Sequence, residues 1–180
     1  PIEQAKPLTS RTYQPRGNTG LWDAFGRAIE ETGTRLRAMP EVERPSQVLF
    51  ITISDGIENS SQRFVPDQLQ EMVEHQRLRY LWQFAFLGAN QDLVRETRLL
   101  GLRSTEIAPW TPTPDGVQEM FARLSERTSL YRRSGQSPVA SFFPPFPGRL
   151  DASRWSDTLR QSEAVMGSIG TTLRQFRPAA

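Results

Sequence analysis

The residues best placed to do chemistry are Ser54, Asp55 and Gly56, which directly follow an unbroken apolar run at 48–53. A short β-rich run that ends in a turn signal is typical of a strand buried on both faces. Open α/β sheets bind their ligands at the carboxyl ends of such strands, so Asp55 is a candidate binding carboxylate. Gly56 would let the backbone turn away sharply from the strand. In the alternative interpretation, Asp55 only forms the turn.

Several other kinds of chemistry find no support in the sequence. The chain has no cysteine, which excludes disulfides and thiolate metal sites, and its single histidine, His75, argues against a histidine metal cluster or a catalytic triad. We expect His75 at the surface, because it falls one step off the apolar stripe of its predicted helix. No phosphate-binding glycine loop and no second acidic cluster accompany Asp55. We therefore expect no enzymatic activity.

Apolar periodicity predicts the elements that position Asp55. Residues at spacings of three and four indicate helices, and short apolar runs indicate strands. Thr19 lies at or near the start of the first helix, where an N-cap hydroxyl belongs, and Thr113 is expected to cap the last one. The predicted helices lie at 21–36, 66–80, 90–100 and 113–131, and the predicted strands at 48–53, 81–87 and 104–108.

Composition divides the chain into three parts. Its 180 residues suffice for one domain with a core, which we place at 1–131. A proline- and phenylalanine-rich linker or surface strap follows at 132–150, and a helical or disordered tail at 151–180. The net charge of +2 gives no electrostatic case for nucleic acid or membrane as a partner. No apolar run reaches the roughly 20 residues of a membrane helix, and no signal peptide is visible, so we expect a cytoplasmic protein.

Three motifs, taken in order, resemble one family. The chain reads GNTGLWDA at 17–24, VLFITISDGIENSS at 48–61 and WQFAFLGANQD at 82–92. This order is similar to von Willebrand factor A-type (vWA) domains of the bacterial and phage-like branch, over about residues 7–131. The resemblance implies a doubly wound, mostly parallel α/β sheet. It also implies a metal-ion-dependent adhesion site, built from three loops at the carboxyl ends of the strands.

The resemblance carries two of these metal positions to this chain. Thr19 matches the threonine of the second loop, and Asp55 matches the aspartate of the third. The Asp-x-Ser-x-Ser of the first loop is absent, and Asp151-Ala152-Ser153 supplies only its first half. Mg²⁺ takes about six oxygen ligands, so these two residues form a partial site. The first strand of the family would lie before Pro1, and we expect a fold that is incomplete at its N-terminus.

The function implied by the resemblance is protein interaction. A Mg²⁺ held by few carboxylates can take an acidic residue of a protein partner as its last ligand. One alternative is a degenerate, metal-free domain that serves as an assembly part. A second alternative is a Mg²⁺-dependent hydrolase that uses Asp55.

Overall fold

The computed structural model of the chain describes residues 4, 6, 7, 9–12, 17–89, 96–134, 142 and 143. Within them the fold is mixed α/β. Its elements, in chain order, are α1 (Leu21–Ala38), the short 3₁₀ helix η2 (Glu41–Glu43), β1 (Leu49–Ser54), α2 (Pro66–Tyr80), β2 (Gln83–Gly88), the 3₁₀ helix η3 (Ser104–Glu106), β3 (Ile107–Pro109) and α4 (Pro114–Arg133).

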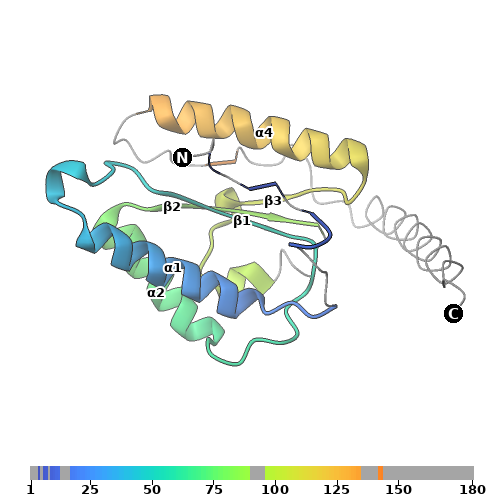
Figure 1. The fold of residues 1–180 in the computed structure, drawn as a ribbon, viewed down its shortest axis with the longest axis horizontal. Coiled ribbons are helices and arrows are strands. Elements are labelled where there is room, and N and C mark those ends of the chain that lie inside the picture. The colour runs from blue at the N-terminus through green and yellow to red at the C-terminus, as the bar shows by residue number, and fades with distance from the viewer. Residues whose placement is uncertain are drawn as a thin grey trace, which may run out of the picture.

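The three strands form one parallel sheet in the order β1-β2-β3. β1 and β2 pair along their whole length, from Leu49 opposite Gln83 to Ser54 opposite Gly88. Helices α1 and α2 lie on one face of the sheet and α4 lies on the other (Figure 1). The predicted β1-α2-β2 parallel unit is therefore confirmed, and all carboxyl ends of the strands meet at one edge of the sheet.

The core between the sheet and helices α1 and α2 is aromatic. Phe25 of α1 meets Phe50 of β1 edge to face, with ring centroids 5.2 Å apart, and Phe84 of β2 lies beside both. Gly26 of α1 lets Phe64, in the loop between β1 and α2, approach the helix closely. A Cβ at Gly26 would stand 2.6 Å from Cδ1 of Phe64. Phe64 is buried in the same cluster, so the segment after β1 is anchored against the start of α1.

The core under α4 covers β2 and β3. Three side chains of α4 are buried there, against the face of the sheet opposite α1 and α2: Met120, Leu124 and Tyr131. Phe142 and Phe143 are also buried in this cluster, and the backbone N–H of Phe143 donates to the carbonyl of Thr105 at 2.9 Å. Two residues of the predicted linker or strap therefore belong to the core. Burying two adjacent phenylalanine rings is favourable, because it removes a large apolar surface from water.

Three sequence-based expectations about burial and strand limits are wrong. β1 is not buried on both faces, since Ile51 and Ile53 are 38% and 41% exposed. The reason is its place at the edge of the described sheet, where it pairs with β2 while α4 packs over β2 and β3. Leu81 does not begin the second strand, because it has φ 56° and ends α2 in the left-handed conformation. The third strand does not begin at Ser104, because Ser104–Glu106 form the 3₁₀ helix η3.

Other expectations at the helix ends are confirmed. The Thr113 hydroxyl accepts a hydrogen bond from the N–H of Gly116 at 3.1 Å and caps α4, and α2 begins at Pro66. Residues 96–99 are helical, whereas the earlier part of that predicted helix and the predicted tail at 151–180 lie outside the described residues. No helix in the described part of the chain is long and apolar enough to cross a membrane.

Candidate functional site

The loop that follows β1 wraps around the N-terminus of α1. A helix begins with backbone N–H groups that have no partner inside the helix, and this loop supplies partners for two of them. The N–H of Trp22 donates to Oε2 of Glu58 at 2.9 Å, and the N–H of Asp23 donates to the hydroxyl of Ser61 at 3.0 Å. The loop therefore caps a helix that lies about thirty-six to thirty-eight residues away in the sequence.

Glu58 is the centre of this loop. Its Oε1 accepts the N–H groups of Ser60 and Ser61 at 2.8 and 2.7 Å, and its Oε2 accepts the Ser61 hydroxyl at 2.7 Å. Burial of the Glu58 carboxyl acts to raise its pKa. The hydrogen bonds from Ser61, Trp22 and Ser60 outweigh burial and lower the pKa below its ordinary value. Glu58 is thus held as a carboxylate, with both oxygens engaged.

Asp23 forms the return contact from the helix to the loop. Its Oδ2 accepts the N–H of Gln62, and its Oδ1 accepts those of Arg63 and Phe64, each at 2.9 Å. The N–H groups of Gln62 and Phe64 do most to lower the pKa of Asp23 below its ordinary value. An acid in the first turn also favours the positive end of the helix dipole. This carboxylate is therefore a structural clamp.

Thr19 lies against the end of β1. Its backbone N–H donates to Oδ1 of Asn59 at 2.8 Å, and its carbonyl accepts the N–H of Asn59 at 3.1 Å. Its hydroxyl points at Gly56, where an added Cβ would stand only 2.5 Å from Oγ1 of Thr19. The two residues predicted from the sequence, Thr19 and Asp55, are thus carried by two loops that touch at the carboxyl end of β1.

Asp55 is exposed at this edge of the sheet. Beside it, the buried Ser54 hydroxyl donates to the carbonyl of Gly56 at 3.0 Å and forms a local turn. Thr19 does not cap α1, because Gly20 occupies the N-cap position and makes no side-chain cap. The expected N-cap role of Thr19 is therefore wrong. The loop residues Glu58 and Ser61 satisfy the first N–H groups of α1 in its place.

The residues at this edge fit only part of a Mg²⁺ shell. Thr19 and Asp55 offer a hydroxyl and a carboxylate, whereas Glu58 and Asp23 are already engaged by backbone N–H groups. Within the described residues, no three histidine, cysteine, aspartate or glutamate side chains gather in a way that could hold a metal ion. Residues 90–92, which end the third motif, lie outside the described residues. A metal here would keep several waters or take a ligand from elsewhere.

Sequence reasoning missed the roles of Asp23 and Glu58. The signal for Asp23 was available, because an acid in the first turn of a helix commonly meets unpaired N–H groups. Glu58 also binds its neighbours Ser60 and Ser61, but nothing local points to its bond with Trp22, which lies far away in the sequence. Such a contact follows only from how the loop is folded.

Comparison with known proteins found no match to a protein-family model, to a curated protein or to a solved structure. The resemblance to vWA domains therefore rests on the three sequence motifs and stays a prediction.

Proposed function

We propose that this chain is a vWA-like protein-interaction module whose binding surface is the carboxyl end of β1. The observation that supports this most strongly is the contact of the Thr19 side chain with Gly56, beside the exposed Asp55. Two loops far apart in sequence thereby present a hydroxyl and an exposed carboxylate at one edge of the sheet. Among the residues that the structure describes at this edge, none forms a nucleophile and base pair, so the proposal includes no catalysis.

In this proposal Thr19 and Asp55 are ligands of a Mg²⁺ ion that a partner's acidic residue completes. Because Glu58 and Asp23 are engaged elsewhere, a cation at this edge would meet only one protein carboxylate from the described residues. A divalent cation so weakly neutralised retains affinity for a further carboxylate. An acidic side chain of a protein partner is the group that would supply it.

A metal-free assembly role is the second candidate, and a different observation favours it. Ile51, Ile53 and Ile57 are 38%, 41% and 42% exposed along β1 and the residues after it. In the described sheet β1 has a neighbour on one side only. An apolar edge strand of this kind pairs readily with another chain, and such pairing needs no metal.

A magnesium titration followed by NMR separates the two candidates. If the proposal holds, Mg²⁺ shifts the amide signals of Thr19, Asp55 and Gly56, and a short glutamate-containing peptide then binds only with Mg²⁺ present. Asp55→Ala abolishes both effects, whereas Glu74→Ala, which removes an exposed carboxylate from α2, leaves them unchanged. Peptide binding that survives a chelator would reject the metal and favour the apolar edge of β1. Shifts that persist in Asp55→Ala would reject this site.

A further inference from the structure

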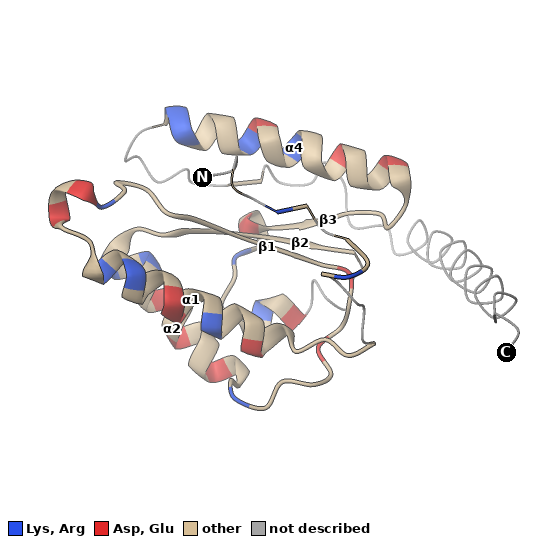
Figure 2. Ribbon diagram, in the orientation of Figure 1, with Lys and Arg blue, Asp and Glu red and all other residues tan. Residues whose placement is uncertain are grey.

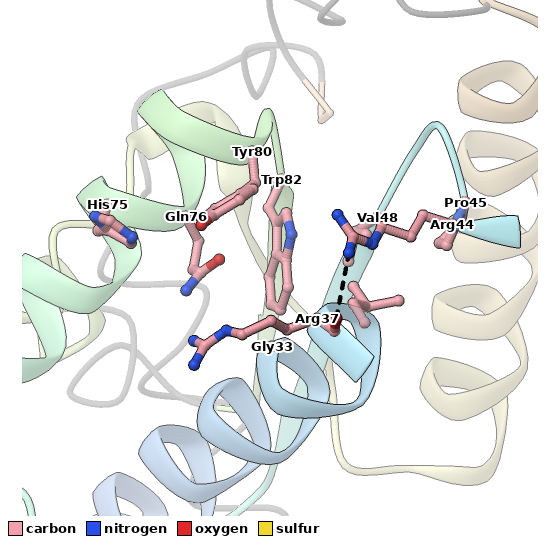
Figure 3. Close-up of a pocket in the computed structure, with 10 residues that line it drawn as sticks. Gly33, Arg37, Arg44, Pro45, Val48, His75, Gln76, Tyr80 and Trp82 are labelled. Atoms are coloured by element: carbon pink, nitrogen blue, oxygen red, sulfur yellow. Dashed lines mark hydrogen bonds between the residues drawn. The ribbon is translucent and has the colours of Figure 1, made fainter. Parts of the chain in front are cut away.

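A second site lies at the amino end of β1, away from Thr19 and Asp55. There a pocket of about 180 Å³ opens between the last turns of α1 and α2, the loop after η2 and the residue that precedes β1. Its walls include the six side chains of Leu36, Arg37, Arg44, His75, Tyr80 and Trp82 (Figure 3). Ligand pockets for drug-sized molecules commonly reach 300 Å³ or more, so this one suits a ligand of about one ring.

The floor of the pocket is flat, apolar and firmly held. The Trp82 indole is 4% exposed and stacks on Phe50, with ring centroids 6.2 Å apart and planes inclined by 20°. Leu36 and Val48 are partly buried and pack against the same core. A planar ring entering the pocket would therefore meet a preformed apolar surface, which keeps the entropic cost of binding low.

Arg44 is fixed in place at the wall. Its Nε donates to the carbonyl of Met39 at 3.0 Å. Its Nη2 donates to the carbonyl of Arg37 at 3.2 Å, as Figure 3 shows. A guanidinium has five N–H donors, so these two bonds orient the group and leave other donors for a ligand. Arg37 adds a second guanidinium to the lining, and its side chain extends away from that of Arg44 (Figure 3). Arg37 forms no ion pair with any residue that the structure describes.

No carboxylate of the described residues is paired with these two cations. Helices α1 and α2 both end here, and helix C-termini carry partial negative charge. Arg44 neutralises part of that charge by binding two carbonyls at the end of α1. Glu41 and Glu43 lie on η2, next to the basic last turn of α1 (Figure 2). Both side chains are exposed, and neither is paired with Arg37 or Arg44.

We propose that this pocket binds a small aryl anion, a single aromatic ring that carries a carboxylate or phosphate group. The ring would lie on the apolar floor formed by Trp82, Leu36 and Val48. The anionic oxygens would accept hydrogen bonds from Arg44, and the exposed Arg37 side chain would turn toward them on binding. The planar fork of each guanidinium matches carboxylate and phosphate geometry. Neither Mg²⁺ nor the Thr19–Asp55 edge takes part, because the six residues of β1 separate the two sites by roughly 20 Å.

The test is an NMR titration of the full chain, monitored at the Trp82 indole N–H, whose signal is assigned with Trp82→Phe. Benzoate and phenyl phosphate are the probes, and benzyl alcohol and benzylamine are the neutral and cationic comparisons. We expect both anions to shift the Trp82 signal, and their relative affinities show which acid group the pocket prefers. Arg37→Gln should weaken the binding of the anions about tenfold, the loss expected for one charge-assisted contact.

Arg35→Gln is the matched control, because it removes the same charge from the same exposed last turn of α1 outside the pocket lining. It should leave the affinity for benzoate nearly unchanged. Arg44→Lys keeps the charge but loses the fork, and it should weaken binding even where the fold is intact. The proposal is overturned if neither anion shifts Trp82, if benzylamine binds as tightly as benzoate, or if Arg35→Gln and Arg37→Gln weaken binding equally.

Discussion

The two ends of β1 use charged side chains in opposite ways. At the carboxyl end, Glu58 and Asp23 are engaged by backbone N–H groups and hold the loop to α1. The neighbouring Asp55 is exposed there. At the amino end, Arg44 binds carbonyls and still lines an open pocket. Charge alone therefore does not mark a binding residue. The residue to test is the one whose charge the fold leaves unpaired.

The largest effect should come from removing the carboxylate that holds the loop. Glu58→Ala leaves four donors without their acceptor, and we expect a loss of about 3 kcal/mol in the free energy of unfolding. Urea unfolding measures it. Glu74→Ala on the exposed side of α2 is the control and should cost little. Equal losses in the two variants would show that Glu58 is not a structural clamp.

A smaller loss in the free energy of unfolding should follow from a steric clash between the loops that carry Thr19 and Gly56. In Gly56→Ala the new Cβ meets Oγ1 of Thr19, and we expect a cost of about 1–2 kcal/mol. Thr19→Ala removes that oxygen and leaves the Thr19 Cβ at 3.4 Å, so the double variant should recover part of the loss. A double-mutant cycle measures the coupling. Strict additivity would mean that the loops do not touch.

Low pH should destabilise the contacts at the carboxyl end of β1 more than those in the rest of the molecule. Hydrogen bonds lower the pKa values of Asp23 and Glu58 below their ordinary 3.8 and 4.5. The unfolded chain takes up protons near those ordinary values, so this stabilisation is complete above them and is lost as pH falls through the lowered folded-state pKa values. Urea midpoints measured at successive pH values below 4.5 should therefore fall less steeply in Glu58→Gln than in the parent chain. Parallel curves would contradict this assignment.

The sequence predicted the order of elements better than their packing. The apolar stripe of α1, the Pro66 start of α2 and the Thr113 cap of α4 are local signals, and each is confirmed. The exposure of Ile51 and Ile53 could not be read locally, because it depends on which strands α4 covers.

The candidate site was likewise predicted in part. The strand end and its motif pointed to Asp55, and the resemblance pointed to Thr19, which the structure brings to the same edge. The binding of Glu58 to Trp22 was beyond sequence reasoning, since it joins residues far apart through a loop with no regular period. The pocket at the amino end was missed for the same reason, because its wall residues come from four separate segments.

The smallest effect bears most directly on the proposed function. Thermal unfolding of the chain with and without millimolar Mg²⁺, repeated for Asp55→Ala, tests whether the exposed carboxylate at the carboxyl end of β1 binds a cation. At a Mg²⁺ concentration about ten times its Kd, mass action predicts a rise in Tm of roughly 2–5 °C, absent in Asp55→Ala. No rise, or an equal rise in Asp55→Ala, would contradict the assignment of Asp55 as a metal ligand.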